Sequence, residues 1–244
     1  MFACDFATVV VIAAIFIASF TQGLVGFGFG LVAVPILVLF LSPSLVVPLI
    51  CLLATVLTSM VLFEARKYVN IKKITPLFIG GVVGMPLGIW VLKVIDADLI
   101  KVSMGSIIVL FGIVSLIGFR RHVLQESKAL GIIGLASGFL NSSTALSGPP
   151  VILFFSNQGW KKEEFRANII AYFVGLNIIT LVSFYFSGFL TSEVFQVSLY
   201  TFPPMILGTL VGIYLSRRVS QNVFAKLALI IVTGAGITSI ISVL

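Results

Sequence analysis

Apolar segments of membrane-spanning length alternate with short polar or basic stretches along the whole chain. They run at about 6–22, 24–41, 45–63, 75–92, 99–118, 130–156, 167–187, 198–215 and 223–243. A helix needs about 20 mainly apolar residues to cross a hydrocarbon core of ~30 Å. Uninterrupted segments of this kind predict ordinary transmembrane helices, and they are 45–63, 75–92, 99–118, 167–187, 198–215 and 223–243.

The remaining segments carry glycine and proline where a helix tolerates them poorly. Glycine costs about 1 kcal/mol relative to alanine in a helix interior, and proline costs about 3 kcal/mol. Irregular backbone inside a bilayer survives only if it is buried in protein or lines a cavity. We therefore predict two broken-helix hairpins, at 23–35 and 138–150, that meet at the working site. Their structural residues are Gly23, Pro35, Gly138, Gly148, Pro149 and Pro150.

Composition places the chain among integral membrane proteins. It is 59% hydrophobic and only 9% charged, whereas a soluble domain carries about 25% charged residues. Residues 1–8 include Asp5 but no lysine or arginine, so they lack the positive region of a cleaved signal peptide, and we expect the first helix to remain. The expected partners are the lipid bilayer and a small solute, with no nucleic acid.

Basic residues cluster in the loops at 66–73, 120–128, 161–166 and 217–226, and of the 15 only Lys93 and Lys101 lie elsewhere. The positive-inside rule places these four loops in the cytoplasm. Since the loops on both sides of 130–156 are then on one side, this segment must enter the membrane and return. The prediction is a plasma (inner) membrane protein with both termini outside.

The two halves of the chain, 1–119 and 128–244, repeat this order in opposite directions. Gly84 and Gly88 match Gly208 and Gly212 in spacing, and small residues so spaced let membrane helices pack closely. We predict an all-α polytopic membrane protein with an inverted-topology repeat. Each half is a re-entrant or broken-helix hairpin plus three transmembrane helices. Such proteins bind substrate near the midplane, at the broken helices.

The Asp, Glu, Lys, Arg and His side chains lie only at the ends of the predicted spans or in loops. This argues against a proton relay through a buried carboxylate and against a metal centre, which needs a cluster of histidine, cysteine or carboxylate ligands. Cys4 and Cys51 form no CxxC motif, so we expect no thiol redox chemistry. The chain is expected to need no cofactor and to be no enzyme.

Neutral groups remain to form a site: backbone N–H groups, hydroxyls and amides. The N-terminus of a half-helix offers donors and a partial positive charge, which suit an anion. The candidate substrate-binding residues are Gln22, Gly26, Phe27, Gly28, Gly30, Asn141, Ser142, Ser143, Thr144 and Ser147, with Asn177 and Thr180 as further candidates. As alternatives, the hydroxyls of 142–144 bond to carbonyls of their own helix, Asn141 joins two helices, and Phe27 is a core, lipid or gating contact.

The run from Gly23 to Pro35, its echo ending in Ser147-Gly148-Pro149-Pro150, and the two-fold layout resemble the TauE/SafE family of membrane permeases. The resemblance covers nearly the whole chain. It implies transport, usually export, of small sulfur-containing anions such as sulfite and organosulfonates. The chain departs from the glycine-rich family pattern at Phe29 and at 141–144.

Two other functions compete with a secondary transporter. A passive anion or small-solute channel would also use facing half-helices, as aquaporins do, but the Asn-Pro-Ala signature is missing from both hairpins. A membrane enzyme or redox carrier has less support, because the chain has no CxxC, metal cluster or nucleophile–base pair. The sequence does not indicate whether the coupling ion is H⁺ or Na⁺.

Overall fold

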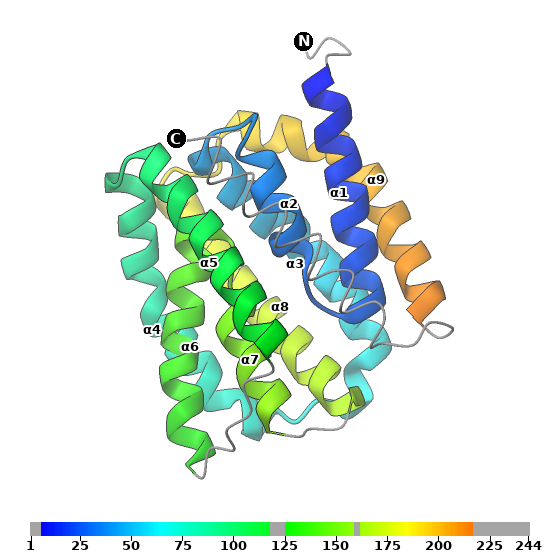
Figure 1. The fold of residues 1–244 in the computed structure, drawn as a ribbon, viewed down its shortest axis with the longest axis vertical. Helices are drawn as coiled ribbons and strands as arrows, with labels where there is room; N and C mark the ends of the chain where they lie inside the picture. Colours follow the sequence, from blue (N-terminus) through cyan, green and yellow to red (C-terminus); the bar gives the residue numbers. More distant parts are fainter. Residues whose placement is uncertain (1–5, 118–124, 159–161, 217–244) are drawn as a thin grey trace.

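The computed structural model describes residues 6–117, 125–158 and 162–216, and this part of the chain is helical throughout (Figure 1). Its elements are α1 (Phe6–Val25), α2 (Phe29–Leu37), α3 (Pro43–Ala65), the short 3₁₀ helix η1 (Arg66–Tyr68), α4 (Ile71–Val94), α5 (Ala97–Ile117), α6 (Glu126–Thr144), α7 (Gly148–Asn157), α8 (Lys162–Phe186) and α9 (Ser192–Ser216). The predicted span 223–243 lies outside the described residues. So do Cys4 and the basic positions Arg120, Arg121, Lys161, Arg217, Arg218 and Lys226.

Six described helices are long and apolar enough to cross a membrane: α1, α3, α4, α5, α8 and α9. The ordinary spans predicted within the described residues are therefore confirmed, and the chain is an all-α polytopic membrane protein. Large apolar side chains cover much of its outer surface, as at Phe186 (82% exposed), Leu199 (73%) and Ile132 (72%). A soluble monomer rarely exposes apolar patches of such extent, so these side chains fit a lipid-facing surface.

Both predicted hairpins contain a helix break, and each break is shorter than the glycine-to-proline stretch that predicted it. Only residues 26–28 separate α1 from α2, and only 145–147 separate α6 from α7. Gly23, Pro35 and Gly138 lie inside helices instead. Gly148 to Pro150 form the first turn of α7, where proline is tolerated because a first-turn N–H has no acceptor within the helix.

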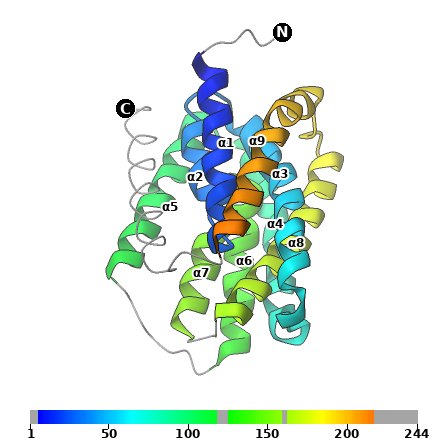
Figure 2. The ribbon, with the colours of Figure 1, turned by 90° about the vertical axis from the view of Figure 1, so that its right-hand side faces the viewer.

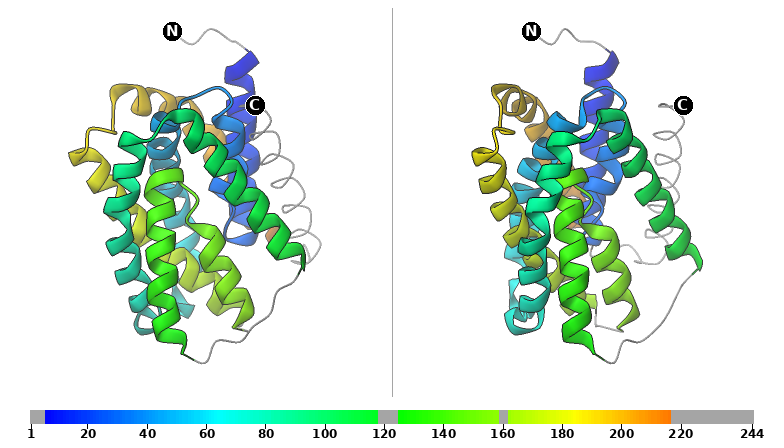
Figure 3. Two further views of the ribbon diagram at one scale, coloured as in Figure 1. Left: turned by 60° about the vertical axis from the view of Figure 1, so that its left-hand side comes forward. Right: turned by 90° about the vertical axis from the view of Figure 1, so that its left-hand side faces the viewer.

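The hairpins enter from opposite ends of the molecule. In Figure 1, α1 descends from the N-terminal end and α2 returns toward that end. In Figure 3, α6 rises from the other end and α7 turns back to it. With 9 residues in α2 and 10 in α7, each returning helix is about 14–15 Å long at 1.5 Å per residue. Each therefore spans only half of a ~30 Å hydrocarbon core.

Glycines bring two pairs of parallel helices into close contact. α1 and α9 lie side by side in Figure 2, and a Cβ at Gly208 would come within 2.5 Å of the Phe16 carbonyl oxygen. α4 and α6 form the other pair, where a Cβ at Gly84 would collide with the Leu135 carbonyl oxygen. Since the obstacles are backbone atoms, larger residues cannot be accommodated by a rotamer change. The packing role predicted for these glycines is confirmed.

The starts of α4, α6 and α8 share one end of the molecule, here called the basic end. The Asn70 N–H, which precedes α4, donates to Asn168 Oδ1 of α8 at 2.7 Å, and α6 runs parallel to α4. The described basic side chains at this end are Arg66, Lys67, Lys72, Lys73, Lys128 and Arg166.

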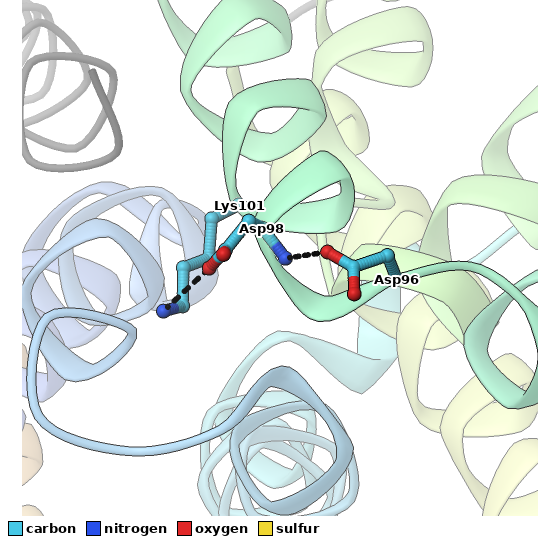
Figure 4. Close-up of polar contacts among 3 residues, drawn as sticks. All are labelled: Asp96, Asp98 and Lys101. Carbon is cyan, nitrogen blue, oxygen red and sulfur yellow. Dashed lines mark hydrogen bonds and ion pairs between the residues drawn. The ribbon is translucent and has the colours of Figure 1, made fainter.

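The opposite end carries a nearly neutral turn between α4 and α5 (Figure 4). There Asp96 Oδ1 accepts a hydrogen bond of 2.9 Å from the Asp98 N–H. Lys101 pairs with Asp98 at 3.3 Å in the first turns of α5. The two ends thus differ in charge in the way the loop composition predicted.

Candidate functional site

The two helix breaks meet at a cavity of about 40 Å³. Its walls come from both hairpins and from α3 and α8. Gly30 and Ala145 bring the breaks together, because a Cβ at Gly30 would lie 2.5 Å from the Ala145 carbonyl oxygen. The lining residues are Gln22, Gly28, Phe29, Gly30, Leu31, Ile50, Cys51, Ala54, Thr58, Asn141, Ala145, Leu146, Ser147, Gly148, Phe173 and Asn177.

Glycine conformation produces the first break. Gly26 has φ 94° and Gly28 has φ 109°, a region that side chains other than glycine enter only at a cost. Gln22 then holds the turn together. Its Oε1 accepts a 2.9 Å hydrogen bond from the Phe29 N–H, and its Nε2 lies 3.5 Å from the Gly26 carbonyl oxygen. Gln22 therefore caps α2 from the preceding helix.

The N-terminus of α2 presents donors to the cavity. The first N–H groups of a helix have no acceptor within it. Gln22 takes the Phe29 N–H, while the N–H groups of Gly30 and Leu31, both in the cavity wall, have no such acceptor in α2. These donors, together with the partial positive charge of the helix end, would favour an anion.

The second break is built differently. Ala145 has φ 58°, and the Leu146 N–H reaches back to the Leu140 carbonyl oxygen at 3.3 Å, as in a Schellman-type helix end. Pro149 and Pro150 then occupy the first turn of α7 and carry no N–H. We expected the N-terminus of a half-helix to offer backbone N–H donors. The first turn of α2 does so, whereas the first turn of α7 has fewer such donors because two of its residues are prolines.

Side-chain amides supply polar groups on the second side of the cavity. Asn141 Nδ2 donates to Asn177 Oδ1 at 3.1 Å and to Thr180 Oγ1 at 2.9 Å. Asn141 and Asn177 both line the cavity and are 2% and 4% exposed. Asn141 therefore both lines the cavity and joins two helices, and Thr180 lies behind it.

Of the ten candidate substrate-binding residues, five lie in the cavity wall: Gln22, Gly28, Gly30, Asn141 and Ser147. The other five are not in the wall: Gly26, Phe27, Ser142, Ser143 and Thr144. Of the two further candidates, Asn177 lines the cavity and Thr180 does not. A helix turns by 3.6 residues per turn, so consecutive residues after Asn141 face different neighbours.

The three hydroxyls after Asn141 follow the backbone-bonding alternative. Ser142 Oγ shares its single proton between the Met85 carbonyl oxygen of α4 at 2.8 Å and the Gly138 carbonyl oxygen at 3.0 Å. Ser143 and Thr144 donate to carbonyl oxygens of α6 at 2.7 and 2.8 Å. Because the proton of each hydroxyl is donated to a backbone carbonyl oxygen, it is not directed to the cavity.

Two residues near the site were assigned other roles from the sequence. Cys51, for which we expected no thiol redox chemistry from the sequence, lines the cavity with Sγ 4.0 Å from the Asn141 carbonyl oxygen. Arg166, read as part of a basic loop, lies in α8 and donates from Nη2 to the Gly23 carbonyl oxygen at 3.2 Å. Arg166 directly precedes the predicted span 167–187, and this position next to an apolar segment could have indicated that it belongs to the helix.

Comparison with known proteins assigns the family. A family model described as "Sulfite exporter TauE/SafE" matches residues 11–239. The chain belongs to the TauE/SafE family. One relative of this TauE/SafE protein is "Probable sulfite/organosulfonate exporter TauE" from Cupriavidus necator, 23% identical over 202 residues, which cover 80% of this chain and 78% of the relative. No solved structure matches. The resemblance drawn from the two hairpin stretches is confirmed.

The cavity of this TauE/SafE protein has a definite chemical character. Among the described residues, its wall combines apolar side chains with amide, hydroxyl, thiol and backbone groups and contains no charged side chain. Nor do the described residues include a group of three or more His, Cys, Asp or Glu side chains that could hold a metal ion. Such a wall suits a small solute recognised through hydrogen bonds.

Proposed function

We propose that this TauE/SafE protein is a secondary transporter that exports a small sulfur-containing anion, such as sulfite or an organosulfonate. One observation carries the proposal: helix breaks from opposite ends of the molecule meet at a cavity whose wall offers neutral donors. The α2 N-terminus would offset the charge of the anion. The family and the exporter relative support the substrate class.

The cavity volume favours the smallest members of that class. One water needs roughly 10–15 Å³ measured in this way, so about 40 Å³ accommodates about three waters. An inorganic oxyanion such as sulfite is of comparable size. An organosulfonate with a carbon chain would require the two breaks to move apart.

The proposed ligands come from both hairpins. The N–H groups of Gly30 and Leu31 would donate to the anion from one side, and the amides of Asn141 and Asn177 would reorient to donate from the other. Gln22 is a positioning residue, because its side chain is occupied in capping α2. In this proposal the anion is bound by neutral backbone and side-chain N–H groups alone, without a cation in the cavity wall.

We also propose that residues 1–119 and 128–244 form an inverted repeat with α1 equivalent to α6 and α4 equivalent to α9. The close contacts support this equivalence. Gly208 of α9 packs on the carbonyl oxygen of Phe16, as Gly80 of α4 packs on that of Gly131. The last predicted span of the second repeat, 223–243, lies outside the described residues.

Further contacts repeat with the same spacing. A Cβ at Gly23 would approach the Thr209 carbonyl oxygen, and one at Gly138 would approach that of Gly81. Gly212 likewise meets Phe20 as Gly84 meets Leu135. This register pairs Gly80 and Gly84 with Gly208 and Gly212, one turn away from the pairing that spacing alone suggested.

The charge distribution supports a sidedness for the proposed exporter. The basic end would face the cytoplasm and the N-terminal end the outside of an inner membrane. An anion from the cytoplasm would then reach the cavity between α7 and α8 and leave it past α2.

Flux measurements test the proposal directly. Purified protein in proteoliposomes should release entrapped sulfite faster than protein-free vesicles, with a rate that saturates as sulfite concentration rises. An excess of a short sulfonate should compete, whereas chloride should compete poorly. A rate that stays proportional to concentration would indicate a channel. Absence of protein-dependent flux of sulfite and of every short sulfonate would refute the proposal.

A further inference from the structure

In the part of the chain that the structure describes, Arg166 and the rings of Phe27, Phe155 and Phe165 lie on the side of the cavity toward the basic end. We propose that Arg166 selects anions on the path from the cavity to the basic end, and that its hydrogen bond to Gly23 holds this path closed. The inference rests on the proposed function, because it assumes that an anion moves through the cavity.

Helix geometry locates this layer below the cavity. In α8, Phe173 and Asn177 line the cavity, and Phe165 lies two turns nearer the helix start, about 12 Å from Phe173 at 1.5 Å per residue. In α7, Gly148 lines the cavity and Phe155 lies about 10 Å farther along toward the basic end. Both helices thus place a phenylalanine at similar depth.

The aromatic rings join three segments of the chain at that depth. Phe27 of the first break meets Phe165 edge to face, with centroids 6.4 Å apart and planes at 71°. Phe165 also meets Phe155 of the second hairpin at 6.4 Å and 79°. Phe27 packs against the apolar core, and in this proposal it takes the gating role that the sequence left open as an alternative. A layer of rings without polar atoms would exclude a hydrated anion until the rings separate.

Arg166 lies against the same break. Its Nη2 donates to the Gly23 carbonyl oxygen at 3.2 Å, across 143 positions of sequence. Its aliphatic stem covers Gly26, where a Cβ would lie 2.8 Å from Arg166 Cγ. Gly23 is in the last turn of α1, whose carbonyl groups carry the partial negative charge of the helix end. The guanidinium thus fastens α8 to the first hairpin.

An approaching anion can take over this hydrogen bond. A guanidinium bonds an anionic oxygen more strongly than a neutral carbonyl oxygen, because the full negative charge of the acceptor adds Coulomb attraction. A sulfur oxyanion would therefore displace Gly23 as acceptor. The displacement frees the first hairpin from α8, and a cation at the same point has no such effect. Because the cavity wall itself is uncharged, the anion is not trapped there.

Cys51 provides a native reporter of this path. It lines the cavity, and with Cys4→Ser as background it is the remaining cysteine of the two in the chain. In inside-out and right-side-out vesicles, its labelling by the anionic 2-sulfonatoethyl methanethiosulfonate is compared with labelling by the cationic 2-trimethylammonioethyl analogue. The ratio of the two rates reports charge selection and does not depend on how much protein is present.

Arg166→Gln should shift that ratio toward the cationic reagent by about tenfold, the scale of one charge-assisted contact, for reagents added at the basic end only. Arg166→Lys should keep the wild-type ratio. Arg66→Gln is the matched control. It removes a guanidinium at the same end that lies 4.5 Å from the Phe63 ring centroid, and its ratio should equal that of the wild type.

Phe165→Ala tests the ring layer. It should speed labelling by both reagents from the basic end without changing their ratio. Equal ratios in Arg166→Gln and Arg66→Gln, or unchanged rates in Phe165→Ala, would overturn the inference. A lower midpoint of thermal unfolding with both reagents affected alike in Arg166→Gln would indicate a structural role and would also overturn it. Where Arg166→Gln does not insert, Arg166→Met replaces it under the same criteria.

A separate measurement distinguishes this inference from the proposed function. Sulfite binding to detergent-solubilised protein should be unchanged in Phe165→Ala, within about twofold, because Phe165 does not line the cavity and offers no group that binds an anion. A wild-type protein that neither binds nor moves sulfite refutes the proposed function, while the labelling ratio still reports on Arg166.

Discussion

The break between α1 and α2 and the break between α6 and α7 face one another across the same cavity, yet they differ in chemistry. Glycines at φ 94° and 109° make the first, and an alanine at φ 58° begins the second. The first turn of the helix that follows the first break places Gly30 and Leu31 in the cavity wall, and their N–H groups have no acceptor within the helix. The helix that follows the second begins at Gly148, and the next two residues of its first turn, Pro149 and Pro150, have no N–H.

This difference indicates a division of labour within one site. The first hairpin contributes backbone donors, which glycine makes accessible. The second contributes side-chain amides through Asn141, which also contacts Asn177 of α8. A cavity between inverted hairpins therefore need not be chemically symmetric. The variants below test this contrast, from the largest expected effect to the smallest.

Gly30→Ala should have the largest effect, because it separates the two breaks. The added Cβ would lie 2.5 Å from the Ala145 carbonyl oxygen, and overpacking of this kind costs about 1–3 kcal/mol. We expect a lower midpoint of thermal unfolding in detergent and loss of sulfite flux. Gly131→Ala is the control. Its Cβ would meet nothing within 4 Å, so stability should be kept or rise. Equal midpoints for both variants would contradict the contact between the breaks.

Asn141→Leu should come next, because it removes the second hairpin's contribution to the cavity. It deletes the bonds to Asn177 and Thr180, which costs about 0.6–2 kcal/mol in a membrane protein. A lost donor to an anion costs more, about 1.5–3 kcal/mol, so sulfite flux should fall at least tenfold. Ser143→Ala, outside the cavity wall, should keep its flux. Similar losses of sulfite flux in both variants would show that the effect does not depend on whether the residue lines the cavity.

Exchanging glycine and alanine between the breaks should change stability in opposite directions. Gly28→Ala forces a side chain into φ 109° and should destabilise the protein by about 1–2 kcal/mol. Ala145→Gly relieves a positive φ and should stabilise it by up to about 1 kcal/mol. Thermal unfolding of the two purified variants measures both. Destabilisation by Ala145→Gly would mean that the second break depends on its side chain.

Pro149→Ala should have the smallest effect and make the second break more like the first. The change restores an N–H in the first turn of α7, beside the cavity residue Gly148. If that donor reaches the anion, sulfite affinity should rise by roughly twofold to tenfold, as expected for one hydrogen bond. Equilibrium binding of radiolabelled sulfite measures this. Unchanged affinity would restrict the backbone donors to α2.

The spans and the breaks could be predicted from the sequence because their causes are local. The length of an apolar run decides whether a helix crosses the membrane, and glycine and proline interrupt a helix wherever they stand. The helices α3, α4, α5, α8 and α9 were placed on that basis. The absence of an N–H at Pro149 and Pro150 is equally local and could have reduced the expected donor count.

Only the tertiary structure decided which side chains face the cavity. Asn141 faces it while Ser142, Ser143 and Thr144 do not, because the neighbours of α6 determine what each side of that helix contacts. Arg166 reaches Gly23 across 143 positions, a distance over which no sequence periodicity relates two residues. Apolar pattern and backbone chemistry are properties of neighbouring residues, whereas the site depends on the register between helices that pack from opposite ends of the molecule.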